Sequence, residues 1–233
     1  MAQKLTNVAV IPDGNRRYAQ RSRVPLNAAY LAGFEKVQEF SSWAREEEVK
    51  TISFWALSLD NFAKRSSGEL NILFKLMSNQ INKALGEKDF KDQNLRVKFF
   101  GKTSILPQKV QEGIAQLEEK TKDFKEYTLN IGIAYNGREE LLEASKKLAA
   151  DITSGKVNPR NVDEDAFSKY LYTPENPQLI IRTGNVQRLS GFMPWQNTYS
   201  ELYFSPKLWP EFTQPDFLKA KEFYETAEQR VGR

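Results

Sequence analysis

Short apolar runs alternate along this sequence with longer segments in which apolar residues recur at helical spacing. The runs predict strands at Val8 to Ile11, Val49 to Leu57, Leu95 to Phe100, Tyr127 to Ala134, Leu179 to Ile181 and Glu201 to Phe204. The periodic segments predict helices at Ala28 to Glu48, Leu70 to Leu85, Val110 to Lys125, Glu139 to Ile152, Val162 to Tyr172 and Pro215 to Arg230. Since the connections are longer than hairpins need, the pattern indicates an α/β fold with a mainly parallel central sheet of about six strands, covered by helices.

Polar side chains follow directly after several of these strands, namely Asp13, Ser58, Tyr135 and Arg182. Parallel strands end at the same edge of a sheet, and ligands of such sheets bind outside that edge. We therefore expect these side chains to share one edge, and we expect a polar loop from Ser58 to Arg65. No repeat or linker rich in proline and glycine divides the chain, so a single domain over residues 1–233 is predicted.

The composition limits the chemistry that a site can use. Cysteine and histidine are absent from the 233 residues, which excludes disulfides, thiol nucleophiles and triads that use histidine, and disfavours zinc. Any metal should be a hard cation held by oxygen atoms, with Mg²⁺ as first choice. The net charge of +4 fits an anionic ligand. The basic residues are scattered along the sequence instead of forming one stripe, so a nucleic-acid-binding protein is not indicated.

The apolar runs are far too short to span a membrane, as Ile52 to Leu57 illustrates. The first residues, Met1 to Leu5, lack the apolar core of a signal peptide. Apolar residues make up 40% of the chain and charged residues 27%, as in soluble globular proteins. We expect a cytoplasmic protein.

The stretch from Asn7 to Ala19 contains the first candidate site. An apolar run stops at Pro12 and is followed by Asp13, Gly14, Asn15, Arg16 and Arg17. Such a turn can direct backbone N–H groups and guanidiniums at an anion, and the adjacent carboxylate suggests a metal that bridges the protein to a diphosphate. On this stretch alone, an Asp-Gly turn with solvated arginines remains an alternative.

A second cluster follows the strand that ends at Ile181. Arg182 and Arg188 lie on either side of a loop that contains Gly184, and the Ser190 hydroxyl lies just beyond. Two forked guanidiniums and a hydroxyl suit a diphosphate, although a surface loop with stem-packed arginines is an equal alternative.

A third candidate is Glu201, which lies in a strongly apolar and aromatic run. A carboxylate is costly there unless it is paired or binds a metal, so a metal ligand and a salt-bridged glutamate both remain open. Gly101-Lys102-Thr103 is not a P-loop, because Arg96 stands where that motif requires glycine. Together the three clusters predict an enzyme that handles two diphosphates, at least one of them with an apolar tail.

Several motifs occur in one order along nearly the whole chain: Val10 to Ala19, Ile181 to Gly184, Arg188 to Ser190, Trp195 with Gln196, Tyr199 to Phe204, Leu208 to Phe212 and Arg230 to Gly232. In this order they closely resemble the cis-prenyltransferases, the undecaprenyl diphosphate synthase family. The resemblance implies a Mg²⁺-dependent enzyme that transfers the prenyl group of an allylic prenyl diphosphate, usually to isopentenyl diphosphate. It also implies a homodimer with a hydrophobic tunnel in each subunit. A long-tailed product would favour transient contact with a membrane surface.

The resemblance also implies roles for individual residues. Asp13 would be the essential carboxylate near Mg²⁺, and Glu201 of the partner subunit would be a second metal ligand. Asn15, Ser58 and Asn61 would join Asp13 in catalysis. The residues that would bind substrate are Gly14, Arg16, Arg17, Tyr30, Phe62, Lys64, Arg182, Arg188, Ser190, Arg230 and Gly232.

The sequence departs from the family pattern near the diphosphates. Tyr30 replaces the usual histidine, Leu26 replaces an arginine, and Val186 replaces a glutamate. The family's Ser-x-Glu-Asn-Trp segment reads Ser58 to Phe62 here, and its next asparagine is Ala63. Because of these changes, the sequence does not determine which residues relay the proton or which molecule accepts the prenyl group. Alternatives are O-prenylation of an alcohol and irregular coupling of two allylic diphosphates. A non-catalytic subunit of a heteromeric enzyme is a further alternative, disfavoured by the intact first motif.

Overall fold

The computed structural model describes residues 3–86 and 93–228. Its strands form one sheet of order β3-β4-β2-β1-β5-β6, in which every neighbouring pair is parallel. The strands are β1 (Asn7–Ile11), β2 (Thr51–Ser58), β3 (Leu95–Phe100), β4 (Tyr127–Tyr135), β5 (Leu179–Arg182) and β6 (Glu201–Phe204). The predicted α/β class and parallel sheet are confirmed.

The helices of the described residues are α1 (Asn15–Ser22), α2 (Leu26–Glu46), α3 (Leu59–Lys64), α4 (Ser67–Gly86), α6 (Gln108–Thr121), α7 (Gly137–Thr153), α8 (Glu164–Ser168) and α9 (Gln214–Thr226). Short 3-10 turns occur at Thr103–Ile105, Pro159–Asn161 and Trp209–Glu211. No helix of the described residues is long and apolar enough to cross a membrane.

Two predicted elements differ from the structure. The expected polar loop after β2 is wrong, because Leu59–Lys64 forms α3: the Ser58 side chain caps the helix by accepting a hydrogen bond from the Asn61 N–H. The helix expected over Val162 to Tyr172 is also too long. Only Glu164–Ser168 is α-helical, and the chain then turns so that the Tyr172 N–H donates to the Glu140 carboxylate.

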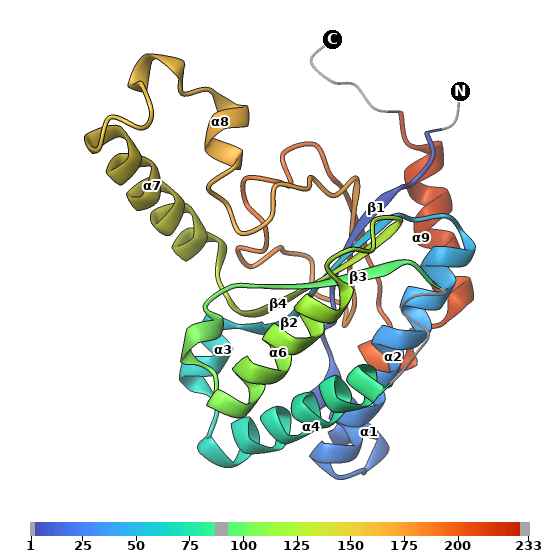
Figure 1. Cartoon of the computed structure of the whole chain (residues 1–233). Coiled ribbons are helices and arrows are strands. Elements are labelled where there is room, and N and C mark those ends of the chain that lie inside the picture. Colours follow the sequence, from blue (N-terminus) through green and yellow to red (C-terminus); the bar gives the residue numbers. More distant parts are fainter. Residues whose placement is uncertain (1–2, 87–92, 229–233) are drawn as a thin grey trace.

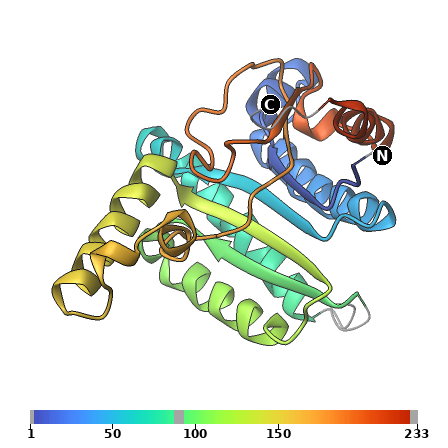
Figure 2. The same ribbon diagram turned by 90° about the horizontal axis from the view of Figure 1, so that it is seen from above.

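Helices and loops cover the two faces of the sheet unequally. Helices α2 and α9 pack over β1, β2 and β5, while α4 and α6 pack over β3 and β4 on the same face. The other face is covered by the loop between β5 and β6, through Phe192 and Met193. Figures 1 and 2 both show α7 and α8 together at one side of the molecule, away from α2 and α9.

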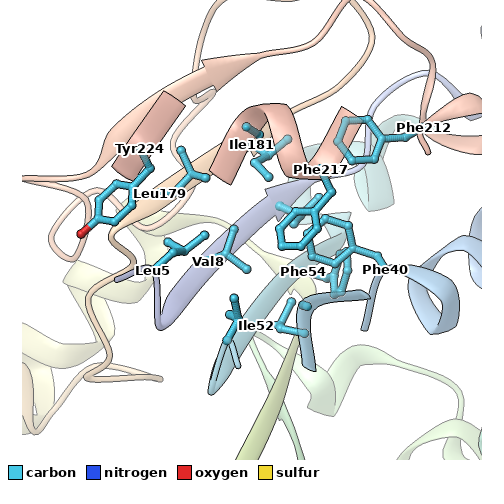
Figure 3. Close-up of a cluster of buried hydrophobic side chains, with 14 of the residues drawn as sticks. Leu5, Val8, Phe40, Ile52, Phe54, Leu179, Ile181, Phe212, Phe217 and Tyr224 are labelled. Carbon is cyan, nitrogen blue, oxygen red and sulfur yellow. The ribbon is translucent and has the colours of Figure 1, made fainter. Parts of the chain in front are cut away.

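Aromatic rings fill the core between α2, α9 and the sheet (Figure 3). Phe40 of α2 contacts Phe217 of α9 and Phe54 of β2, with ring centroids 4.9 Å and 5.5 Å away. All three side chains are at most 1% exposed. Burying each such ring stabilises the fold by about 1.5–3 kcal/mol, so this core fixes α2 and α9 against the strands that carry the site.

The outer edge of β3 is closed by side chains of α6. The Val97 N–H donates to Thr121 Oγ1 over 3.1 Å, and the Phe99 N–H donates to Glu118 Oε1 over 2.7 Å. These two N–H groups would otherwise be unpaired on an edge strand.

The strand order creates a crevice between β1 and β5. The chain leaves β1 towards β2 on one side and leaves β5 towards β6 on the other. Where outgoing connections diverge in this way, the carboxyl ends of the two strands flank a natural binding site. Asp13 lies just beyond β1, and Arg182 is the last residue of β5.

Candidate active site

A cavity of about 520 Å³ opens at the carboxyl ends of β1, β2 and β5. It is lined by Ile11, Pro12, Asp13, Gly14, Asn15, Arg16, Arg17, Tyr30, Gly33, Phe34, Val37, Trp55, Ala56, Ser58, Asp60, Asn61, Arg65, Leu73, Arg182, Arg188, Ser190 and Trp209. Most of the residues predicted from the first two clusters therefore meet in one place. A volume of this size is typical of sites for small molecules and cofactors.

The Asp13 carboxylate is engaged on both oxygens by guanidiniums. Arg17 Nη2 donates to Oδ1 over 3.1 Å, and Arg182 Nη2 donates to Oδ2 over 2.9 Å. The Asp13 carbonyl is also held, since Thr183 Oγ1 donates to it over 2.8 Å and the Trp209 N–H donates over 3.1 Å. The position of this carboxylate is thus fixed by its side chain and its backbone.

Arg182 connects the first two clusters. Its Nη1 donates to Ser190 Oγ over 2.9 Å and to the Arg188 carbonyl over 2.5 Å, while Nη2 donates to Asp13. The residue is only 6% exposed, so its fork has a fixed orientation. Within residues 3–86 and 93–228, no hydrogen bond or ion pair uses the side chains of Arg16 or Arg188. Both guanidiniums are available to an anion.

Helix α1 begins at Asn15, directly after Gly14, and no side chain caps it. The N-terminal N–H groups of such a helix favour an anion. Asn15 Nδ2 donates to the Pro12 carbonyl over 3.4 Å, but Asn15 Oδ1 is buried without a hydrogen-bond partner. A buried acceptor that lines a cavity and lacks a protein partner points to a bound water or ligand.

Polar residues at the junction of β2 and α3 also line the cavity. Ser58 Oγ accepts a hydrogen bond of 3.0 Å from the Asn61 N–H, and Asp60 lies between them on the same wall. The predicted residues Ser58 and Asn61 therefore both line the cavity, and the N-cap hydrogen bond of α3 fixes them relative to each other.

Part of the cavity lining is apolar. It includes Phe34 and Val37 of α2, Leu73 of α4, and Trp209. Trp209 is 1% exposed, and its Nε1–H donates to the Gly33 carbonyl over 2.8 Å. A ligand with a charged head and an apolar tail fits a cavity lined by both charged and apolar residues.

Tyr30 lines the cavity but has a partner of its own. Its hydroxyl donates a hydrogen bond to the Glu69 carboxylate. Burial raises the pKa of Tyr30 well above its usual value, and the hydrogen bond to Glu69 raises it further. The phenol therefore stays protonated at neutral pH, and its proton is already committed, unlike that of a free histidine.

Several predicted residues do not reach the cavity. Phe62 packs on Phe74 with ring centroids 6.1 Å apart, and Lys64 is exposed outside the lining. Tyr135 ends β4 as expected, but its side chain is fully buried and its hydroxyl donates to Glu140 over 2.6 Å. It therefore shares the sheet edge without sharing the site.

Glu201 lies at the other end of the sheet. It opens β6 and pairs with Leu179, which in turn pairs with Val8 near the start of β1. The carboxylate cannot join Asp13 of its own chain. Arg230 and Gly232 lie outside the described residues.

A hard metal ion fits this site if oxygen atoms of a bound ligand supply the coordination that the protein does not. The described residues contain no group of three or more acidic side chains that could enclose a metal. Mg²⁺ in proteins is commonly bound by one or two carboxylates together with substrate phosphates and water. Asp13 supplies such a carboxylate beside cations that could hold the phosphates.

Arg65 and Trp209 are among the lining residues that were not predicted from the sequence as site residues. Arg65 follows Lys64 at the end of α3, and only the packing of the helices decides which of the two cations faces the cavity. Trp209 lies far along the chain in a segment that reads as core. Its ring packs against Phe40 and Phe54 in the core, and the residue also lines the cavity.

The chain matches the family model described as "Putative undecaprenyl diphosphate synthase" over residues 11–232. A Thermoplasma volcanium protein, named tritrans,polycis-undecaprenyl-diphosphate synthase (geranylgeranyl-diphosphate specific), is 42% identical over 229 residues, covering 97% of this chain and 88% of that protein. The protein of the same name from Methanocaldococcus jannaschii is 36% identical over 231 residues, covering 97% and 82%. Lavandulyl diphosphate synthase from Lavandula x intermedia, solved in complex with dimethylallyl diphosphate, has a TM-score of 0.93 and 31% identity, covering 99% of both chains.

Proposed function

Because this chain belongs to the undecaprenyl diphosphate synthase family of cis-prenyltransferases, we propose that it extends an allylic prenyl diphosphate with isopentenyl diphosphate in the cis configuration, releasing diphosphate. The observation that carries this proposal is the Asp13 carboxylate, held between Arg17 and Arg182 in a cavity lined by both charged and apolar residues. Prenyl transfer itself is the activity of the family.

The donor would occupy the side of Arg16, Arg17 and the N-terminus of α1. Breaking the bond between its first carbon and the diphosphate oxygen places negative charge on the leaving group. Fixed guanidiniums and helix N–H groups stabilise that charge without rearrangement, and this kind of preorganised stabilisation is usually the largest contribution to catalysis. Bound Mg²⁺ would add neutralising charge to the same diphosphate.

The acceptor would occupy the side of Arg182, Arg188 and Ser190. Its double bond forms a carbon–carbon bond with the first carbon of the donor, and a proton then leaves the acceptor. The apolar walls at Phe34, Val37 and Leu73 would bury the donor tail and keep water from the cation-like carbon. Each buried methylene contributes about 0.8 kcal/mol to binding.

Product analysis tests the proposal. The purified protein is incubated with Mg²⁺, labelled isopentenyl diphosphate and allylic donors from dimethylallyl to geranylgeranyl diphosphate, the donor named for the relatives above. Mass spectrometry and stereochemical analysis should find cis-extended chains. Failure of every donor to give an extended product would refute the proposed reaction.

One observation supports a second candidate, in which the acceptor is an alcohol or a second allylic diphosphate. The Tyr30 hydroxyl is committed to Glu69, so the position where the family usually has histidine offers no free proton acceptor. The same incubations without isopentenyl diphosphate decide between the two reactions. A coupled product in that arm would favour the second candidate.

We also propose that Glu201 acts in the site of a second copy. Glu201 cannot reach Asp13 within one chain, while β6 lies at an edge of the sheet and exposes Leu202 to 37%. Mixing inactive Asp13→Asn and Glu201→Gln proteins under exchange conditions should restore about a quarter of wild-type activity, because half of the pairs would contain one intact site. No recovery, with exchange verified by labelled chains, would argue against a shared site.

A further inference from the structure

The loop between β5 and β6 carries Arg188 and Ser190, and none of its residues, 183–200, belongs to a helix or a strand. Its backbone enters the left-handed region at Ser190, Gly191 and Met193, with φ values of +55°, +85° and +48°. Residues other than glycine rarely adopt this conformation, which persists only where surrounding contacts hold it. The presentation of Arg188 and Ser190 to the cavity therefore depends on what anchors the loop.

The Glu140 carboxylate of α7 is the centre of one anchor. It is buried, and it accepts hydrogen bonds from the Tyr135 hydroxyl over 2.6 Å, the Tyr172 N–H over 2.8 Å and Gln196 Nε2 over 3.3 Å. Among the residues that the structure describes, no lysine or arginine forms an ion pair with Glu140. A buried carboxylate without a cation is costly, so these donors stabilise it. Gln196 belongs to the loop and attaches it to α7 directly.

Tyr135 provides a second attachment. Its hydroxyl accepts a hydrogen bond from the Met193 N–H over 3.1 Å while it donates to Glu140. Burial and the neighbouring carboxylate raise the pKa of Tyr135, so the phenol keeps the proton that it donates. Because Met193 is one of the residues with a positive φ, this hydrogen bond holds the strained part of the loop.

The first turn of α7 packs directly against the same segment. The Gly137 N–H donates to the Gly191 carbonyl over 3.1 Å, and a Cβ on Gly137 would overlap that carbonyl and Pro194. On the other side, the Phe192 ring stacks on Trp55, which lines the cavity, with ring centroids 5.1 Å apart. The loop is therefore fixed up to the residue that follows Ser190.

We propose that Glu140 and Tyr135 are positioning residues for the acceptor. They hold the loop in the conformation in which Arg188 and Ser190 meet the acceptor diphosphate. Arg182 fixes the same segment from the cavity side, since it donates to Ser190 Oγ and to the Arg188 carbonyl. Neither Glu140 nor Tyr135 lines the cavity, so their influence reaches the ligand only through the loop. This inference rests on the proposed function for the identity of the acceptor.

Tyr135→Phe tests the role by removing one oxygen atom. The protein is saturated with Mg²⁺ and dimethylallyl S-thiolodiphosphate, an analogue that occupies the donor side, and isopentenyl diphosphate is then titrated in a calorimeter. Its affinity should fall about fivefold to a hundredfold, because the Met193 N–H and the Glu140 carboxylate each lose a buried partner.

The affinity for the donor analogue distinguishes positioning from a general loss of structure. In Tyr135→Phe it should stay within about twofold of wild type, because Arg17 on the donor side is held by Asp13 and by the Gly184 carbonyl and not by Glu140. A loss of structure would weaken the binding of both ligands alike. Equal weakening of the two ligands would therefore overturn the positioning role.

Tyr170→Phe is the matched control. The Tyr170 hydroxyl donates to Asp151 Oδ2 over 2.8 Å, so this change removes the same atom from another pair of a tyrosine and a carboxylate of α7. Asp151 lies near the end of the helix that is far from Glu140. The affinity of this variant for isopentenyl diphosphate should stay within about twofold of wild type. Equal affinities of Tyr135→Phe and Tyr170→Phe would refute the inference.

Two further variants keep the test decisive. Gln196→Met releases the direct attachment at a similar side-chain volume, and it serves if Tyr135→Phe fails to fold. It should also weaken the binding of isopentenyl diphosphate more than that of the donor analogue. In an Arg188→Gln background, Tyr135→Phe should have little further effect, because Tyr135 acts through the placement of Arg188. Fully additive losses would contradict this order of action.

The outcome also separates this inference from the proposed function. Chain extension by the wild type, with an affinity for isopentenyl diphosphate that does not depend on Tyr135, would remove the positioning role alone. If the wild type gives no extended product, inorganic diphosphate is titrated in the same comparison. Weaker binding by Tyr135→Phe than by Tyr170→Phe would then leave the anchored loop as a diphosphate site and remove the proposed reaction, whereas equal affinities would remove both.

Discussion

Asp13 and Arg182 stand at the ends of adjacent parallel strands, and Arg182 Nη2 lies 2.9 Å from Asp13 Oδ2. The pair joins the side of the cavity assigned to the donor with the side assigned to the acceptor. Arg182 also donates to Ser190 and to the Arg188 carbonyl, so one buried guanidinium contacts groups on both sides of the cavity.

Asp13→Asn should lower kcat by about a hundredfold or more, because it removes the charge at the reacting centre while keeping the shape of the side chain. The fold should persist, since Thr183 and Trp209 hold the backbone at this position independently. Steady-state kinetics and thermal unfolding check the two statements. Asp165→Asn, at an exposed position of α8, is the control and should leave kcat unchanged.

Magnesium should bind poorly to the protein without a diphosphate. Both Asp13 oxygens are occupied by guanidiniums, so a cation would have to displace Arg17 or Arg182 before it could bind. A diphosphate would draw those guanidiniums to itself and free the carboxylate. Isothermal titration should show Mg²⁺ binding at least about tenfold tighter with inorganic diphosphate present than without it, a coupling of about 1.4 kcal/mol. Equal affinities in the two titrations would contradict this linkage.

Gly184→Ala should disturb the site as well as the fold. Gly184 has φ +87°, and a Cβ at this position would collide with Arg17 Nη2 and lie 3.0 Å from the Asp13 carbonyl. Gly155, after α7, has φ +76° and open space around it, so it is a matched control for backbone strain alone. Both substitutions should cost about 1–2 kcal/mol of stability from backbone strain, and only Gly184→Ala should also raise the KM for the donor. Denaturant unfolding and kinetics measure the two effects, and unchanged donor kinetics in Gly184→Ala would contradict the role given to Arg17.

Glu140 should make stability depend on pH. It is 1% exposed, and burial raises the pKa of its carboxyl despite hydrogen bonds from Tyr135 and Gln196. Because the folded state then binds the proton more tightly than the unfolded state, the free energy of unfolding falls as pH rises from the ordinary glutamate range through the raised pKa.

The comparison with Glu140→Gln, which cannot titrate, isolates this effect. From neutral pH downwards, the wild type should gain stability relative to the variant in urea unfolding experiments. A difference that stays constant with pH would show that Glu140 does not titrate in this range. Glu112→Gln, an exposed position on α6, should run parallel to the wild type.

The sequence was sufficient to predict the sheet and the charged half of the site. Asp13 and Arg182 each follow an apolar strand, and parallel pairing alone brings such positions to one edge. The direction of a side chain on a helix was harder to predict. Lys64 was expected in the site and Arg65 faces it instead, because the contact of Glu69 and Tyr30 with Arg65 is set by packing among three helices.

The polar stretch after Ser58 shows a second limit. Its composition is typical of a loop, whereas its order places a capping serine before Asp60 and a lysine in the last turn, which favours a short helix. Tyr135 shows a third. Its position at the carboxyl end of the fourth strand was predicted, but its hydroxyl donates to the buried carboxylate of Glu140 in α7, and its side chain does not line the cavity.

The sealed edge of β3 has a consequence for assembly. Thr121 and Glu118 already occupy two N–H groups of that edge, so an incoming strand would have to displace them, whereas β6 at the opposite edge has β5 as its strand neighbour and no strand beyond it within the described residues. Growth of the sheet from chain to chain is therefore blocked on one side. Association that uses the β6 edge of each copy is self-limiting, and it ends with two chains instead of continuing into a filament.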